Sequence, residues 1–195
     1  MSPSPSSTPT ATAVNIVLIN ILAFQLGWFA CVFGAARGSL WSGPIVVTLS
    51  LALHLTFAKD RWEEARLFVL AAMVGFFLDS IQAATGTFSF TTAETMPEWS
   101  PPWLSPPWMV ALWPNFATTF HTSLSWLTGR YALAACLGAM GGPLSYYAGA
   151  RLGALTFPGE LATHLFIVGL VWAIAMPVLL KLAEKKPAPT LRHSV

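Results

Sequence analysis

The sequence predicts an all-α fold, a polytopic membrane bundle of six transmembrane helices with the N-terminus and the C-terminus both on the cytoplasmic side. The first observation is composition, since 55% of the 195 residues are apolar and 9% are charged, against roughly 25% charged in soluble domains. The second is charge sorting, because basic residues near span ends stay cytoplasmic. Six spans place most basic residues on one side, namely Lys59, Arg61, Arg66, Arg130, Lys181, Lys185, Lys186 and Arg192, and leave Arg37 and Arg151 on the other.

The predicted spans follow an N-terminal tail, residues 1–13, whose uncharged Ser, Pro and Thr residues predict disorder. The apolar run 14–36 is longer than the apolar region of a secretory signal and lacks its basic start, so we expect a retained span. Further runs near the ~20 residues needed to cross the hydrocarbon core lie at 44–58, 65–84, 108–127, 131–150 and 161–181. The transmembrane domain is therefore 14–182, and 183–195 is a basic cytoplasmic tail.

The longest external segment, about 85–107, leads into the fourth span and repeats the motif Pro-Pro-Trp, with Trp103 and Trp108 as its aromatic residues. Proline pairs prevent a continuing helix and favour a stiff, extended path. The tryptophans are expected either to anchor the loop at the lipid headgroups or to form a lid over an outward-facing cavity.

Asp79 lies inside the predicted span 65–84. An ionisable group inside the bilayer costs roughly 2.5 to 3.5 kcal/mol, so Asp79 is expected to have a partner or a wet cavity. Counting from the external span ends places Asn115, Tyr146 and Arg151 in the same outer half. Asp79 is therefore either a functional carboxylate or half of a structural pair with Arg151.

The predicted span 108–127 has the densest polar face. At 100° per residue its polar side chains fall within an arc of about 160°, so this face should look inward; they are Asn115, Thr118, Thr119, His121, Thr122 and Ser125. They are expected to form interhelical hydrogen bonds, or a ligand or proton path through His121. If His54, Asn20 and Gln25 converge with His121, they would line an inner cavity.

Small residues predict close helix packing in two spans. Ala134, Gly138 and Gly142 recur at four-residue steps in 131–150, and a similar stripe in 14–36 consists of Ala23, Gly27, Ala30 and Gly34. The stripe in 14–36 is expected to meet the fifth span or another subunit, so homo-oligomers or hetero-oligomers through these faces are one expectation.

The remaining composition limits the partners. Cys31 and Cys136 are expected at different membrane depths, so a disulfide is not predicted, and no Cys/His spacing suggests a metal site. The net charge of +2 comes from separate clusters, which argues against nucleic acid and favours membrane lipid as partner. The sequence leaves the cofactor unknown.

Four segments resemble an uncharacterised bacterial inner-membrane family, domain of unknown function 2878: FQLGWFACVFGAARG, LDSIQAATG, ATTFHTSLSWL and LGAMGGPLSYYAGARLG. The resemblance covers nearly the whole chain and implies a small multi-pass inner-membrane protein, without a reaction. Ser50, His54 and Asp79 are also similar to zinc ligands of the ceramidase superfamily. That family has seven spans and a closing HxxxH, where this chain has Val168 after His164.

The sequence therefore predicts a multi-pass protein of the bacterial inner membrane that binds or modifies a lipid or hydrophobic small molecule at an intramembrane polar cavity. Catalytic candidates are Asp79, His121 and His54. Candidate ligand-binding residues are Asn115, Thr118, Thr122, Tyr146, Arg151, Trp103 and Trp108. The alternatives are the substrate-binding membrane subunit of a small-molecule transporter and a membrane scaffold or accessory subunit. Whether the protein is an enzyme is left open.

Overall fold

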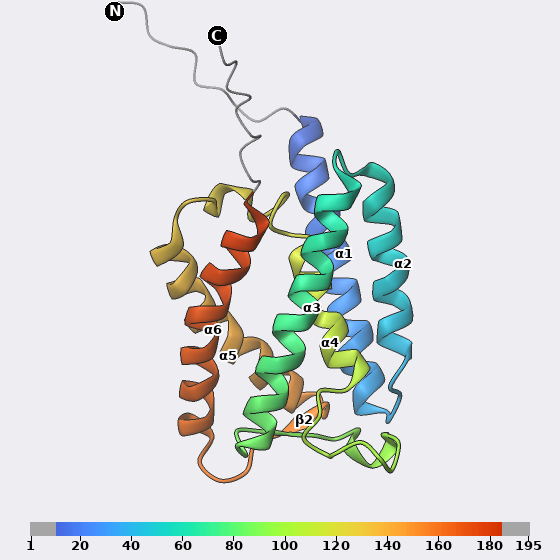
Figure 1. Cartoon of the computed structure of the whole chain (residues 1–195), viewed down its shortest axis with the longest axis vertical. Coiled ribbons are helices and arrows are strands. Elements are labelled where there is room, and N and C mark those ends of the chain that lie inside the picture. Colours follow the sequence, from blue (N-terminus) through green and yellow to red (C-terminus); the bar gives the residue numbers. More distant parts are fainter. Residues whose placement is uncertain (1–10, 185–195) are drawn as a thin grey trace, which may run out of the picture.

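The computed structural model describes residues 11–184, which form six α-helices connected by turns and loops (Figure 1). The helices are α1 (Ala11–Ala36), α2 (Ser42–Phe57), α3 (Arg61–Ala84), α4 (Pro107–Ala117), α5 (Tyr131–Arg151) and α6 (Leu161–Ala183). Two short 3-10 helices, η1 (Ala93–Thr95) and η2 (Ser125–Leu127), and two short strands, β1 (Ser89–Phe90) and β2 (Leu155–Thr156), lie in the connections. Most of both predicted tails, residues 1–10 and 185–195, lies outside the described residues.

Length and hydropathy make this a multi-pass membrane protein. Within the described residues, α1 from Val14, α3 and α6 are long and apolar enough to cross a membrane, and α2 is a shorter apolar helix. Large apolar side chains such as Leu26, Leu49 and Ile174 are exposed on the sides of the bundle. Such an apolar outer surface is suited to contact with the hydrocarbon core of a membrane.

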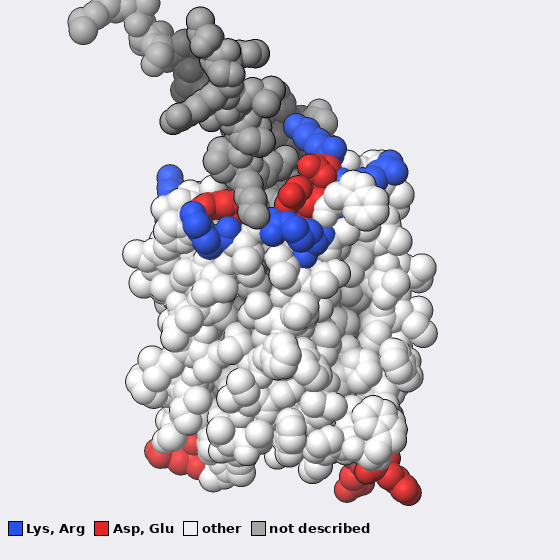
Figure 2. All heavy atoms as spheres, in the orientation of Figure 1, with Lys and Arg blue, Asp and Glu red and all other residues white. Residues whose placement is uncertain are grey.

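Charged side chains occupy the two ends of the bundle (Figure 2). We call one the basic end; its described Lys and Arg residues, which lie at or near helix ends, are Lys59, Arg61, Arg66, Arg130 and Lys181. The other, the acidic end, carries Glu94, Glu98 and Glu160 together with Arg37 and Arg151. The described basic residues are thus sorted between the ends as the sequence predicts, while Lys185, Lys186 and Arg192 lie outside the described residues.

The predicted fourth span is the main error in the sequence-based fold. An α-helix to residue 127 is wrong, because α4 ends at Ala117 and the chain continues through turns to η2. The hydroxyls of Thr118, Thr119, Ser125 and Thr128 each donate to the carbonyl three residues earlier, at 2.6 to 2.8 Å. Such local bonds compete with the helical ladder.

Glycines allow the closest helix contacts. In α5, a Cβ at Gly138 would lie 2.3 Å from the Trp172 carbonyl oxygen of α6, and one at Gly142 would lie 2.3 Å from the Trp172 ring. In α1, Gly27 meets Asn115 of α4 and Gly34 meets Ser42 of α2. Gly27 and Gly34 therefore pack against α4 and α2, not against α5, which was one of the two predicted partners of this stripe, and Gly138 and Gly142 pack within the chain.

Loops at the acidic end are tied together by β1 and β2, which pair antiparallel. The Thr91 hydroxyl donates to the Ala154 carbonyl at 2.8 Å. Trp108 at the start of α4 donates from its indole N–H to the Thr92 hydroxyl at 2.9 Å, and both residues are buried. This packing fixes the acidic-end loops against the helices.

Candidate functional site

Asp79 is fully buried on α3 and accepts two side-chain hydrogen bonds. The Trp113 indole N–H of α4 donates to Oδ2 at 2.7 Å, and the Tyr146 hydroxyl of α5 donates to Oδ1. Gly75, one helical turn earlier, makes room for this arrangement, because a Cβ there would lie 2.0 Å from the Trp113 ring. The carboxyl group of Asp79 thus connects α3 with α4 and α5.

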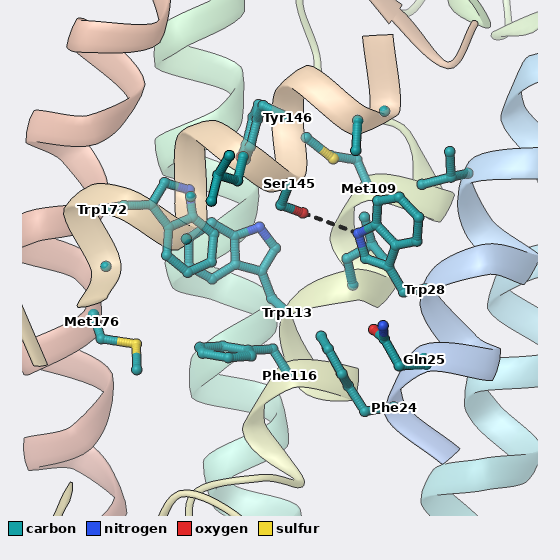
Figure 3. Close-up of a pocket in the computed structure, with 18 of the residues that line it drawn as sticks. Phe24, Gln25, Trp28, Met109, Trp113, Phe116, Ser145, Tyr146, Trp172 and Met176 are labelled. Atoms are coloured by element: carbon teal, nitrogen blue, oxygen red, sulfur yellow. Dashed lines mark hydrogen bonds between the residues drawn. The ribbon is translucent and has the colours of Figure 1, made fainter. Parts of the chain in front are cut away.

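Trp113 also stacks on Trp172 of α6, with ring centroids 4.8 Å apart and planes inclined by 13°. Each indole sits over a glycine, Trp113 over Gly75 and Trp172 over Gly142. Phe116 packs edge-on against Trp172, with ring centroids 5.7 Å apart. The stacked indoles therefore form an aromatic wall in the middle of the bundle (Figure 3).

This wall borders a cavity of about 610 Å³ between α1, α4, α5 and α6, within the usual size range of small-molecule sites. Its aromatic lining residues are Phe24, Trp28, Trp108, Trp113, Phe116, Tyr146 and Trp172. Aliphatic side chains and the glycines of α5 complete most of the lining. Asp79 does not line the cavity; it lies behind the wall and holds Trp113 and Tyr146, which do.

Few polar groups reach the cavity. The Trp28 indole N–H of α1 donates to the Ser145 hydroxyl of α5 at 3.0 Å (Figure 3). Gln25, one turn before Trp28, is exposed and lines the same space. No Asp, Glu, His, Lys, Arg or Cys of the described residues lines it, so its walls are uncharged.

A second carboxylate cluster lies at the basic end, around Glu64 in the first turn of α3. Glu64 Oε1 is 2.7 Å from His121 Nδ1, and Glu64 Oε2 is 3.3 Å from His54 Nε2 of α2. His121 Nε2 lies 2.7 Å from the Ala183 carbonyl oxygen, near the end of α6. Both ring nitrogens of His121 face an acceptor, so the ring can donate both bonds only in its doubly protonated form.

Next to this cluster, the start of α5 is joined to the end of α6. Lys181 Nζ lies 2.6 Å from Glu184 Oε2, and the Tyr131 hydroxyl donates to Glu184 Oε1. Lys181 and the Tyr131 hydroxyl hold the pKa of Glu184 below its usual range. Arg66 of α3 also donates to the Leu182 carbonyl at 3.2 Å. Cationic groups thus complement the carbonyl end of α6.

The predicted catalytic residues fall into separate places. Asp79 lies behind the cavity wall, while His54 and His121 meet at Glu64. The ceramidase-like combination of Ser50, His54 and Asp79 is not assembled, and the described residues contain no group of three or more His, Cys, Asp or Glu side chains arranged for a metal ion.

The predicted ligand-binding residues are also divided. Tyr146 and Trp108 line the cavity. Asn115 and Thr118 are buried in contacts with α1, since Asn115 donates to the Phe24 carbonyl at 2.9 Å and Asn20 donates to the Thr118 carbonyl at 3.1 Å.

The other three lie outside the cavity lining. Thr122 donates to the Thr118 carbonyl at 2.8 Å. Trp103 is 44% exposed on the acidic-end loop. Arg151 is exposed at the end of α5, and the expected pair with Asp79 is wrong because Asp79 is bonded to Trp113 and Tyr146.

Sequence reasoning missed Glu64 and most of the cavity wall. The predicted span 65–84 begins one residue after Glu64, although Glu64 shares a helical face with Leu67, Phe68 and Ala71. That periodicity was a usable signal. Trp113 and Trp172 gave no such signal, because an aromatic residue in an apolar span is indistinguishable from ordinary core.

Comparison with known proteins adds one match. A family profile described as "Protein of unknown function (DUF2878)" matches residues 17–178. No curated protein and no solved structure matches the chain.

Proposed function

Because the chain belongs to the DUF2878 family, whose description gives no function, we propose from the geometry that this protein binds a lipid or another hydrophobic small molecule in the aromatic cavity. The observation that carries the proposal is a cavity of about 610 Å³ with uncharged, mainly aromatic walls, inside a bundle whose outer surface is apolar. Apolar pockets with a few polar groups are the usual form of small-molecule sites.

The exposed residues that line the cavity support access of a ligand from the membrane. Gln25, Leu137, Gly141 and Leu144 line the cavity and are exposed, and all lie within helices, away from the bundle ends. Helices α1 and α5 flank this opening and are not among the closely packed helix pairs of the described residues. A hydrophobic molecule would therefore enter sideways, between α1 and α5, without crossing a charged surface.

The same geometry favours binding over acid-base modification. The carboxyl oxygens of Asp79 face Trp113 and Tyr146. His54 and His121 face Glu64 at the basic end, outside the cavity lining. We therefore propose that Asp79 positions the wall residues Trp113 and Tyr146. The cluster of Glu64, His54 and His121 then joins helices α2, α3 and α6.

The binding test uses two neighbouring positions on α5. Gly141 lines the cavity and a Cβ there meets nothing within 4 Å, so Gly141→Phe fills the space without a backbone clash. Met140 is 65% exposed and does not line the cavity, so Met140→Phe is the matched control. Protein extracted in mild detergent is analysed by native mass spectrometry and by chromatography of its extracted lipids.

We expect the wild-type protein and Met140→Phe to retain a bound hydrophobic molecule, and Gly141→Phe to lose most of it. Equal retention by all three proteins, or no retained molecule in any of them, would overturn the proposal. Melting temperatures of the three proteins separate loss of the molecule from loss of the fold.

We further propose that the basic end faces the cytoplasm of a bacterium and that the protein resides in its inner membrane. The bias of Lys and Arg toward one end supports this orientation. A membrane-impermeant thiol reagent applied to intact spheroplasts should label Glu98→Cys and leave Asp60→Cys unlabelled. The opposite labelling pattern contradicts the orientation.

A further inference from the structure

This inference rests on the proposed function and concerns the chemical class of the bound molecule. We propose that the cavity takes an uncharged lipid with a small, oxygen-bearing polar head, such as a long-chain alcohol or carbonyl compound, and that Gln25 and Ser145 bind this head. A zwitterionic or anionic phospholipid headgroup does not fit the same position.

The walls offer no counter-charge to an ionic head. None of the described Lys, Arg, His, Asp or Glu residues lines the cavity. Asp79, behind the wall, is fully buried and already accepts bonds from Trp113 and Tyr146. A charged head would therefore lose its hydration without gaining a paired charge, and this loss is costly in a low-dielectric site.

The polar groups that do line the cavity are uncharged donors and acceptors of hydrogen bonds. Gln25 and Trp28 are three residues apart on α1, so they share a face. Ser145 accepts the Trp28 N–H, and its own proton has no acceptor among the described residues. The Gln25 amide supplies both donors and an acceptor and makes no hydrogen bond within the described part of the chain. Gln25 and Ser145 therefore each offer a donor to an oxygen atom and an acceptor to a hydroxyl group of a bound molecule.

The depth of this polar group limits the size of the head. At 1.5 Å per residue, Trp28 and Gln25 lie about 12 and 16 Å from the end of α1 at the acidic end, and Ser145 lies about 9 Å from the corresponding end of α5. A phospholipid headgroup at this depth would have to leave the membrane surface, whereas a hydroxyl or carbonyl group is buried at much lower cost.

The rest of the lining suits the hydrocarbon part. Phe24 and Phe116 present flat apolar surfaces on the basic-end side of the Trp28–Ser145 hydrogen bond, and the stacked Trp113 and Trp172 lie beside that bond (Figure 3). Gly141 leaves its part of α5 without side-chain bulk, since a Cβ there meets nothing within 4 Å, whereas Gly138 and Gly142 are covered by Trp172. A flexible chain can therefore lie against α5 at Gly141.

The test uses three probes with the same bromine-tagged alkyl chain and different heads: an alcohol, a carboxylate and a trimethylammonium group. Bromine quenches tryptophan fluorescence at short range, and Trp28, Trp108, Trp113 and Trp172 line the cavity. Quenching is titrated in detergent micelles at pH 8 for the wild-type protein, Gly141→Phe, Gln25→Leu and Ser145→Ala. Thr56→Val, an exposed polar position on α2 away from the cavity, is the control.

We expect saturable quenching by the alcohol alone, its loss in Gly141→Phe, and about 2- to 10-fold weaker binding for Gln25→Leu and Ser145→Ala, as one lost hydrogen bond implies. If a charged probe binds as tightly as the alcohol and Gly141→Phe abolishes its binding, the inference of an uncharged head is overturned, while the cavity proposal remains supported. Unchanged affinity in both polar variants overturns the placement of the head. Absence of quenching by every probe, or quenching that Gly141→Phe does not reduce, overturns both proposals.

Discussion

Glu64 and Asp79 project from the same buried face of α3, one near each end of the helix. At 100° and 1.5 Å per residue their directions differ by about 60° and their positions along the axis by about 22 Å. Each accepts side-chain contacts from two other elements, His54 and His121 for Glu64, and Trp113 and Tyr146 for Asp79. Helix α3 thus joins the bundle at both ends through a carboxyl group.

Replacing Glu64 should weaken the basic end. Glu64→Gln keeps the side-chain volume but removes the charge that faces His54 and His121. We expect the free energy of unfolding, measured by SDS titration in mixed micelles, to fall by about 1 to 3 kcal/mol. Glu63→Gln is the matched control, because Glu63 is a half-exposed neighbour paired with Arg66 and should change stability by less than about 0.5 kcal/mol. Equal effects of the two substitutions would contradict a joining role for Glu64.

The Asp79 contacts should be energetically coupled. Asp79→Asn leaves one acceptor oxygen for two donors, and Tyr146→Phe removes one donor. Each single substitution should lower the free energy of unfolding by about 1 to 3 kcal/mol. The double variant should lose at least about 0.5 kcal/mol less than the sum of the single losses, since both remove the same bond. Strict additivity in this double-mutant cycle would show that the two side chains act independently.

Gly138, Gly141 and Gly142 of α5 should respond differently to alanine. Gly138→Ala and Gly142→Ala place a Cβ within 2.3 Å of Trp172 atoms, so we expect losses of about 1 to 3 kcal/mol in the same titration. Gly141→Ala meets nothing within 4 Å and should be neutral or stabilise the helix by up to about 1 kcal/mol. A loss at Gly141 as large as at Gly142 would argue against the observed α5–α6 packing.

The two cysteines provide a simple check of burial. Both are free, Cys31 is fully buried and Cys136 is exposed. An apolar maleimide should modify one thiol of the folded protein in detergent and two after denaturation. Peptide mapping should place the first modification on Cys136, and rapid modification of Cys31 would contradict the packing of α1 against α2.

Much of the helical pattern could be predicted from the sequence, because long apolar runs bounded by charged or Pro-rich segments leave few alternatives inside a membrane. The start of α3 is an example, since Asp60 caps it by accepting the Glu63 N–H at 3.2 Å. The end of α4 could not be predicted in this way. The polar residues after Ala117 fit a helical arc equally well, and their local hydroxyl bonds decided the outcome.

Predicting the candidate site was harder, since it depends on contacts between helices. The sequence singled out Asp79, Tyr146 and Trp108. The partner that it offered for Asp79 was Arg151, whereas the actual partners donate from an indole and a phenol. Hydropathy gives no information on which aromatic side chains meet across a bundle. Glycine positions do carry this information, as Gly75 and Gly142 show, but only once the facing helix is known.

The shortness of α4 has a consequence for how the protein is assembled in the membrane. Its Pro107–Ala117 helix is about 16 Å long, roughly half the thickness of the hydrocarbon core. A helix of this length is too short to be inserted as an independent membrane span. It packs mainly against α1, α2 and α3, which precede it in the chain. We therefore expect α4 to enter the bilayer against helices already inserted, so that deletion of α1, α2 and α3 would leave α4 at the membrane surface.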